Sequence, residues 1–166
     1  GGCYLSRIDV ATADLYDANA DALQVLEIPL PSYGGRPRFA GEVATLKTYE
    51  DNTLVREILG RPGEGRVLVV DGAGSRRYAL VGDRIGALAV ENGWAGIVVH
   101  GCVRDAVALG GMSLGLRALG TCPRKTEKRK QGLEGVPLVF GGVRFEPGAW
   151  VYADEDGLVV APRALA

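Results

Sequence analysis

Several residue types on which common active sites depend are scarce in this chain of 166 residues. Histidine occurs once, as His100, which nearly excludes a His-rich zinc site and a Ser-His-Asp triad with a spare base. The three cysteines, Cys3, Cys102 and Cys122, are too few and too widely spaced for a disulfide framework, so we expect a reducing, cytoplasmic environment. The four lysines lack the apolar neighbours that a Schiff-base nucleophile needs.

The chain also lacks an excess of charge and long apolar runs. With 19 Lys+Arg against 20 Asp+Glu the net charge is -1, which creates no field that favours nucleic acid or an anionic membrane. No apolar run approaches the ~20 residues of a membrane span, and no apolar leader opens the chain. Because 47% of the residues are hydrophobic and 23% are charged, we expect one folded domain over residues 1–166. Because the charge is balanced and no long apolar run is present, we expect no direct contact to membrane or nucleic acid.

Hydrophobic patterning predicts an α/β fold with mixed sheets and a strand-rich C-terminal half. The β-branched runs at 66–71 and 96–100 are typical of strands buried on both faces, and the helical pattern between them implies parallel pairing. The last third predicts a hairpin over 136–145, followed by strands at 149–153 and 158–161.

Two shorter elements are expected earlier in the chain. Thr12 is a candidate cap for a short helix, and residues 39–48 have the pattern of a strand. A second helix should follow this strand, capped by Asn52 or Thr53.

The glycine-rich turn after Asp71 has two interpretations. A dinucleotide fingerprint needs a third glycine that packs helix against strand. Here Gly72 and Gly74 are present, but Arg77 occupies the third position and the next helix begins about ten residues too late. We therefore favour a tight strand exit in which glycine adopts a positive φ.

The strongest candidate site combines Asp83 with Arg104 and Asp105. Gly82 and Asp83 stand where a helix should start, so the free N–H groups of residues 82–85 would form a carboxylate or phosphate site; alternatively, Asp83 only caps its own helix. Arg104 and Asp105 follow a buried strand, and ligands of open α/β sheets collect outside the carboxyl ends of strands. The two side chains are either a solvated ion pair or a pair that holds a carboxylate beside a hard cation such as magnesium.

Other polar motifs have simpler interpretations. His100 is expected to be a core or rim residue, and Cys102 a small buried residue and not a nucleophile. The basic run at 124–130 is expected to be a solvated loop, with phosphate or RNA contact as the alternative. The acidic residues 154–156 indicate a turn more than a cation-binding loop.

Taken together, motifs along nearly the whole chain resemble one known family. They are Phe39–Gly41, Glu50–Leu54, Val70–Ser75, Gly93–Gly96, His100–Asp105, Gly141–Val143, Pro147–Gly148 and Ala153–Gly157. The family contains the regulator of ribonuclease E activity A and the class II 4-hydroxy-4-methyl-2-oxoglutarate/4-carboxy-4-hydroxy-2-oxoadipate aldolases. The resemblance implies a swivelling β/β/α fold and a homotrimer or dimer of trimers, with each site near a subunit boundary. Members have also been labelled menaquinone-pathway methyltransferases, but the sequence shows no cofactor loop that would support that label.

The resemblance also assigns roles to individual residues. The aldolase branch carries an acidic residue, twenty intervening residues and then Arg-Asp, a spacing that Asp83 and Arg104-Asp105 match. It implies that Asp105 binds a magnesium or manganese ion directly. It further implies that Arg104 binds the pyruvyl unit and stabilises its enolate, and that Asp83 orients a metal-bound water for proton transfer. The turn would present main-chain amides to the substrate carboxylate, so the implied substrate-binding residues are Gly82, Asp83, Arg84, Ile85 and Arg104.

Two functions follow from this resemblance. The first is divalent-metal-dependent cleavage of 4-hydroxy-4-methyl-2-oxoglutarate to pyruvate, with oxaloacetate decarboxylation through the same enolate. The alternative is a non-catalytic regulator that binds a ribonuclease. The regulator branch commonly lacks the aspartate that matches Asp105, so its presence favours chemistry. The family's aldolases have a longer C-terminal segment that donates a carboxylate to a neighbouring subunit, and no counterpart precedes Ala166. Decarboxylation is therefore the activity expected to persist if aldol cleavage is absent.

Overall fold

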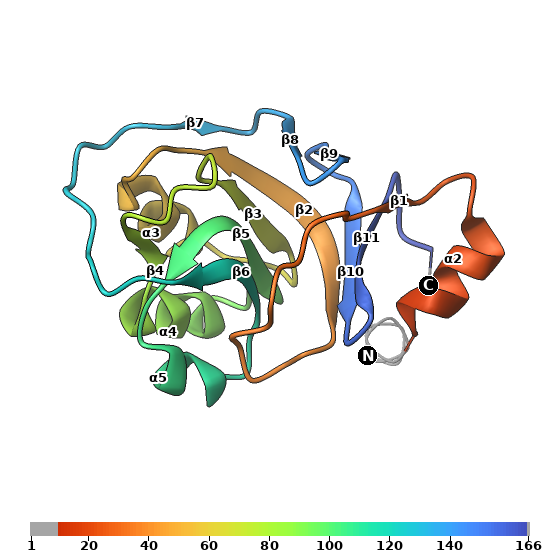
Figure 1. Cartoon of the computed structure of the whole chain (residues 1–166), viewed down its shortest axis with the longest axis horizontal. Coiled ribbons are helices and arrows are strands. Elements are labelled where there is room, and N and C mark those ends of the chain that lie inside the picture. The colour runs from red at the N-terminus through yellow and green to blue at the C-terminus, as the bar shows by residue number, and fades with distance from the viewer. Residues whose placement is uncertain (1–9, 166) are drawn as a thin grey trace.

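A computed structural model describes residues 10–165 and shows the expected α/β fold, built on one large mixed sheet and a separate hairpin (Figure 1). The helices are α2 (Thr12–Asn19), α3 (Thr53–Leu59), α4 (Asp83–Glu91) and α5 (Ala106–Gly110). The strands of the large sheet are β1 (Gln24–Val25), β2 (Phe39–Lys47), β3 (Val67–Asp71), β4 (Ala79–Val81), β5 (Gly96–Val103), β6 (Gly115–Thr121), β7 (Leu133–Glu134), β10 (Trp150–Asp154) and β11 (Gly157–Ala161). The hairpin consists of β8 (Leu138–Phe140) and β9 (Val143–Phe145).

Strand β2 joins the two halves of the large sheet. Its first residues, 39–42, pair antiparallel with β10, which continues to β11 and β1. Its second part, 43–47, pairs parallel with β3, which continues to β5 and from there to β4 and β6. The sheet is therefore antiparallel at the end that carries α2. At the end that carries α4 and α5 it is parallel, apart from the short strand β7, which pairs antiparallel with β2 (Figure 1).

The parallel strands are buried on both faces, as their apolar runs predict. Leu68 and Val70 of β3 pack in the same cluster as the apolar residues of α3, α4 and α5. Val67 and Val69 point to the other face, where they pack with Phe140 and the rest of the β8–β9 hairpin. Every residue of β3 is consequently buried, which is what a continuous β-branched run favours.

Strand β5 is longer than its sequence pattern indicates. The pattern predicts a strand that ends at His100, but the structure continues it to Val103 because Cys102 and Val103 pair with β4 and β6. Cys102 is buried, and burial raises the pKa of its thiol, so the expectation of an inert residue holds. Cys122 is also a free cysteine, and Cys3 lies outside the described residues.

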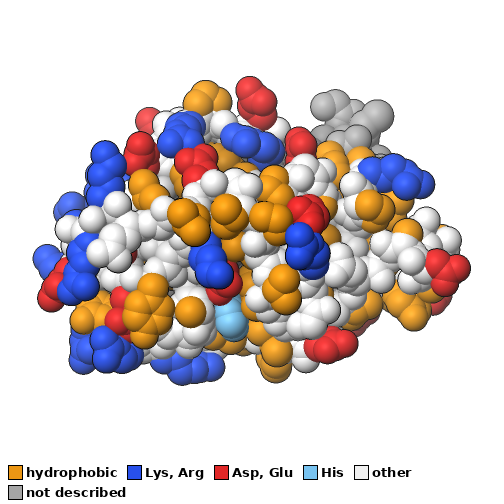
Figure 2. Space-filling model, turned by 90° about the horizontal axis from the view of Figure 1, so that it is seen from above, with side chains coloured by type: hydrophobic (Ala, Val, Ile, Leu, Met, Phe, Trp, Pro, Cys, Tyr) orange, Lys and Arg blue, Asp and Glu red, His pale blue; other side chains and the backbone are white. Residues whose placement is uncertain are grey.

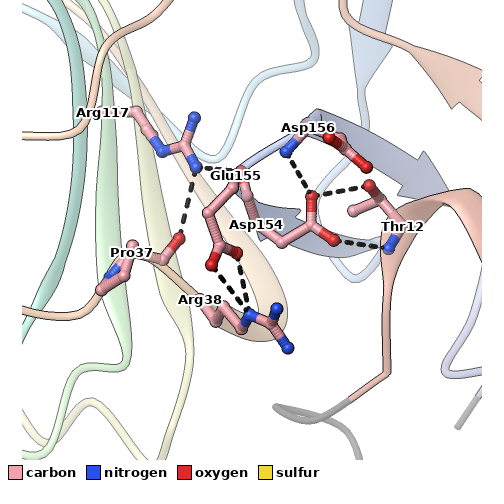
Figure 3. Close-up of polar contacts among 7 residues, drawn as sticks. All are labelled: Thr12, Pro37, Arg38, Arg117, Asp154, Glu155 and Asp156. Carbon is pink, nitrogen blue, oxygen red and sulfur yellow. Dashed lines mark hydrogen bonds and ion pairs between the residues drawn. The ribbon is translucent and has the colours of Figure 1, made fainter.

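The start of α2 differs from the expectation that Thr12 caps it. Ala11 is the N-cap, and Thr12 is the first helical residue. The amide and the hydroxyl of Thr12 donate to Oδ2 and Oδ1 of Asp154, each at 2.7 Å, so a carboxylate of the β10–β11 turn caps this helix. Figure 3 shows Thr12 and Arg117 approaching that turn from opposite sides, with the guanidinium of Arg117 donating to the carbonyls of Asp154 and Pro37. The acidic residues 154–156 thus form a turn, as predicted.

This cap leads to a stability prediction for Thr12→Val. Burial would raise the pKa of Asp154, but the hydrogen bonds from Thr12 and from the Asp156 amide outweigh it and the pKa is lowered. The variant should therefore lose about 2 kcal/mol of unfolding free energy at pH 7. A carboxylate with a lowered pKa stabilises the fold above the unfolded value of about 3.9 and ceases to do so as pH falls through the folded value. Urea unfolding at pH 7 and pH 3 should show the deficit shrinking at pH 3, and a constant deficit would contradict the assignment. The exposed Thr121→Val is the control, with an expected change below about 0.5 kcal/mol.

Within residues 10–165, no helix combines the length and the apolar character that a membrane crossing requires.

Candidate functional site

The ends of β4 and β5 bring the Gly82-Asp83 turn and the Arg104-Asp105 pair together. The two strands are parallel neighbours, and the amide of Arg104 donates to the carbonyl of Val81 at 2.9 Å. Asp105 then adopts a left-handed backbone conformation with φ 60°, which aspartate tolerates better than most residues. Its Oδ2 accepts the amide hydrogen of Asp83 at 3.0 Å. The two segments that the twenty-residue spacing singles out therefore face each other.

Gly82 makes this close approach sterically feasible. A Cβ atom at position 82 would lie 2.9 Å from Oδ2 of Asp105 and 3.3 Å from Nε of Arg104. Its φ of -127° is accessible to any residue, so the requirement for glycine comes from space alone. A larger side chain would push the carboxylate and the guanidinium away from the turn.

The structure corrects two expectations about the turn. Gly82 is the N-cap of α4, so Asp83 is the first helical residue and not the cap. The amide of Asp83 is not free either, since Asp105 accepts it. The amides of Arg84 and Ile85 lie in the first helical turn, where no intrahelical acceptor exists, so they are the ones left to face a ligand. The side chain of Ile85 is buried, and this residue can offer only its main chain.

Asp105 is held in its ionised form. The hydrogen bond from the Asp83 amide is the main cause that lowers the pKa of the Asp105 carboxyl. The side chain of Asp83 and the positive charge of Arg104 lower this pKa further, while burial acts in the opposite direction. The result is a carboxylate at neutral pH with a guanidinium beside it, the combination expected to hold a cation next to an anion.

These residues line one pocket of about 720 Å³ at the end of the parallel strands. Five of its side chains are cationic and only two are carboxylates, so an anion is the ligand that its charge favours. Figure 2 shows Lys and Arg side chains gathered at the left end of the molecule, where Figure 1 places the loop between β6 and β7. The lining residues are Asn52, Thr53, Arg56, Ala79, Gly82, Asp83, Arg84, Ile85, Arg104, Asp105, Lys125 and Lys128.

The basic run at 124–130 is not merely the solvated loop that its sequence indicates. The amide of Cys122 donates to Val103 at 2.9 Å, and the amide of Ala79 donates to Arg124 at 2.7 Å. These bonds hold the run beside the start of β4, where Ala79 also forms a parallel bridge with Lys125, and Lys125 and Lys128 line the pocket. The positive charge of the run at 124–130 was the only feature of the sequence that indicated an anion-binding role. It did not indicate which side chains of the run would lie near Arg104.

The N-terminal part of α3 supplies the opposite wall. The pattern of Leu54, Val55 and Ile58 predicts this helix but not the direction of its polar face. In the structure Asn52, Thr53 and Arg56 line the pocket. Sequence analysis missed all three as functional candidates, because their relation to Arg104 depends on how α3 packs on the sheet.

The donor set fits a hydrated hard cation better than a closed protein site. Among residues 10–165, no three side chains of His, Cys, Asp and Glu gather as they do around a structural zinc ion. The pocket offers the exposed carboxylate of Asp105 with that of Asp83 nearby. Magnesium binds through one or two carboxylates and keeps several waters, so these residues fit it.

The remaining motifs behave as their simpler interpretations predict. Gly74 has φ 72° in a tight exit from β3, and α4 begins only at Asp83, which excludes a dinucleotide fingerprint. His100 lies at the rim, where its ring stacks on Phe140 with centroids 4.6 Å apart. Its Nδ1 lies 3.2 Å from Oδ1 of Asp71, so the histidine is satisfied and outside the pocket.

Fold and site together define an α/β protein with a cationic, carboxylate-bearing pocket at the carboxyl ends of two parallel strands. The chain belongs to the RraA-like family, whose model, described as Aldolase/RraA, matches residues 12–160. The family resemblance inferred from the motifs is thereby confirmed. A relative from Laribacter hongkongensis (strain HLHK9), provisionally named 4-hydroxy-4-methyl-2-oxoglutarate aldolase, is 59% identical over 158 residues, which cover 95% of this chain and 99% of that protein.

Two solved structures share the fold closely. One, described as the S-adenosylmethionine:2-dimethylmenaquinone methyltransferase of Geobacillus kaustophilus HTA426, is 54% identical with a TM-score of 0.93 and covers 94% of this chain and 97% of its own. The other, the RNA-processing inhibitor RraA of Thermus thermophilus, is 46% identical with a TM-score of 0.92 and covers 95% and 96%. The predicted fold class is thus confirmed.

Proposed function

We propose that the chain is a divalent-metal-dependent carbon–carbon lyase that cleaves 4-hydroxy-4-methyl-2-oxoglutarate to pyruvate and decarboxylates oxaloacetate. The observation that carries the proposal is the junction of Asp83, Arg104 and Asp105 at one pocket, with Asp105 only 3.0 Å from the Asp83 amide. The name given to the Laribacter relative supports the same reaction class. Asp105 is the proposed ligand of magnesium or manganese.

Arg104 is the proposed binding and stabilising residue for the 2-oxo acid end of the substrate. Its guanidinium is planar and permanently charged, so it can bind a carboxylate through two parallel hydrogen bonds. The amides of Arg84 and Ile85, at the positive end of α4, can donate to the same carboxylate. These groups hold the reacting end still and favour the negative charge that develops there.

Both reactions pass through the enolate of pyruvate. In aldol cleavage, a base removes the proton of the C4 hydroxyl, the C3–C4 bond breaks, and its electron pair forms the enolate while C4 leaves as the carbonyl of a second pyruvate. In decarboxylation, the bond to the departing carboxylate breaks and carbon dioxide leaves. We assign the proton transfers to Asp83. In aldol cleavage it accepts the hydroxyl proton and returns it to C3 of the enolate, whereas decarboxylation releases no proton and C3 takes one that Asp83 passes on from water. When bound, the divalent cation supplies positive charge against the charge that develops on the 2-oxo group.

The cationic wall is the proposed binding region for the far end of the substrate. Arg56, Lys125 and Lys128 are the cations that line the pocket from α3 and from the loop between β6 and β7. Partial burial lowers the pKa of Lys128, and the positive charges of Lys125, Arg104 and Arg56 lower it further, whereas Asp51 raises it. Mutual repulsion of this kind is relieved when an anion binds, so a substrate with a second carboxylate fits the wall.

A panel of 2-oxo acids tests the proposal directly. Pyruvate release from oxaloacetate and from 4-hydroxy-4-methyl-2-oxoglutarate should require added magnesium or manganese, stop with a chelator and return when metal is restored. Pyruvate should be measured with a coupled dehydrogenase, against the metal-only rate without protein. Turnover that persists in chelator and is trapped by borohydride would instead indicate a lysine imine and contradict the proposal.

Regulation of a ribonuclease is the second candidate, favoured by the similarity to the RNA-processing inhibitor from Thermus thermophilus. Retention of Asp105 beside Arg104 favours the lyase. A pull-down with a ribonuclease separates the two, because inhibition by contact should survive loss of Asp105. The trimer that the resemblance implies stays a prediction, to be measured by light scattering.

A further inference from the structure

The carboxylate of Asp51 is fully buried and saturated with hydrogen bonds. Its Oδ1 accepts the amide of Thr53 at 3.0 Å and the hydroxyl of Thr53 at 2.7 Å. Its Oδ2 accepts the amides of Arg129 and Gln131, each at 3.0 Å. One carboxylate therefore ties the start of α3 to the loop between β6 and β7, although 78 and 80 residues separate it from the two loop amides.

The two segments that Asp51 joins are the two cationic walls of the pocket. Arg56 lies on α3, and Lys125 and Lys128 lie on the loop. Two further hydrogen bonds reinforce this connection between α3 and the loop, here called the joint. Thr126 donates to the side-chain oxygen of Asn52 at 2.8 Å, and Lys128 donates to the Thr126 hydroxyl at 2.8 Å. The joint is therefore built into the pocket wall itself.

The joint opposes a repulsion that would otherwise separate these walls. Partial burial and the positive charges of Lys125, Arg104 and Arg56 disfavour Lys128 as a cation, whereas the negative charge of Asp51 favours it. Burial would raise the pKa of Asp51, but its hydrogen bonds to Thr53 and to the two loop amides outweigh burial and lower it. Asp51 thus stays charged at neutral pH, and from its position outside the pocket lining it compensates part of the positive charge around Lys128.

We propose that Asp51 is a positioning residue that holds the loop carrying Lys125 and Lys128 against α3, and so sets the affinity of the pocket for 2-oxo acids with a second carboxylate. Asp51 does not line the pocket, so it acts through the cations and not on the substrate. The substrate-selecting part of this assignment rests on the proposed lyase function. The anchoring part rests on the hydrogen bonds alone.

Hydrogen exchange of the wild-type protein tests the anchoring without any activity. The backbone amides of Arg129 and Gln131 belong to exposed residues, yet both should be protected against exchange, and more strongly than the amide of Glu127 in the same loop. In Asp51→Asn, an NH2 group that cannot accept hydrogen bonds replaces one carboxylate oxygen and faces the donors of either Thr53 or the loop. Protection of the amides of residues 129 and 131 against exchange should therefore fall at least about tenfold. Unprotected amides in the wild type would overturn the proposal even if the variant fails to fold.

Kinetics then separate positioning from a merely structural role. With oxaloacetate, Asp51→Asn should raise KM about tenfold and leave kcat within about threefold, because the chemistry at Arg104 is untouched. Asp154→Asn is the matched control, a buried aspartate at the other end of the sheet that should lower the melting temperature but leave KM and loop exchange unchanged. Equal effects of the two variants on KM would overturn the assignment. A wild-type protein without turnover would overturn the proposed lyase instead, and the exchange result would still decide whether Asp51 anchors the loop.

Discussion

Replacing Asp105 by Asn is expected to lower pyruvate release from oxaloacetate about a hundred- to a thousandfold. The substitution removes the negative charge with which Asp105 is proposed to hold the cation, while the remaining carbonyl oxygen can still accept the amide of Asp83. Because the side chain is exposed, the variant leaves no buried group without a partner, and its melting temperature should change by no more than about 2 °C. Steady-state assays over a range of magnesium concentrations, beside thermal unfolding, check both parts.

The control for this prediction is Asp156→Asn, which neutralises an exposed aspartate in the β10–β11 turn. Its turnover should match the wild type. Excess magnesium should restore little activity to Asp105→Asn, because the lost carboxylate is the one direct protein ligand proposed. Full activity of Asp105→Asn at the magnesium concentrations that support the wild type would contradict the lyase assignment and leave ribonuclease regulation as the better explanation.

Replacing Arg104 by Lys is expected to reduce kcat/KM about a hundredfold, although the charge is kept. The guanidinium Nη1 donates to the carbonyl of Pro123 at 3.4 Å, and the side-chain stem of Arg104 lies next to Gly82. An ammonium group is a point charge that cannot bind a carboxylate through two parallel bonds, so both binding and enolate stabilisation suffer. The loss should therefore appear in kcat as well as in KM.

Arg129→Lys is the matched control for Arg104→Lys. Arg129 is exposed and its guanidinium pairs with Glu127 at 2.8 Å, outside the pocket, so kcat/KM should stay within about twofold of the wild type. If Arg104→Lys were as active as this control, positive charge alone would suffice and the proposed two-bond grip on the carboxylate would be wrong.

The centre of the site was predictable from local sequence. Asp83 follows a short strand and opens a helix, while Arg104 and Asp105 follow a buried strand, and parallel neighbouring strands end at the same edge of a sheet. The hydrogen bond between Asp105 and the Asp83 amide is a consequence of that register. The left-handed backbone of Asp105 and the space needed at Gly82 were not predictable, because both depend on the exact distance between the two strand ends.

The cationic walls were missed for a different reason. The basic run at 124–130 has the composition of a solvated loop, and its position depends on amides that donate to Asp51, a residue about 80 positions earlier. The Thr12 cap failed in the same way, since the carboxylate that caps α2 comes from Asp154 at the far end of the chain. Neither contact could be predicted from local sequence, because an aspartate in the sequence does not reveal which distant amides will donate hydrogen bonds to its carboxylate.

Local patterning by itself determined the main strands and helices, the burial of the parallel strands and the choice of Arg104 and Asp105 as the candidate pair, because each depends on neighbours within a few residues. Tertiary structure alone decided which cations surround that pair and which carboxylates hold the loop and helix that carry them. Those choices depend on long-range hydrogen bonds that form only when the sheet has formed, and they bring scattered charges together in one cationic pocket.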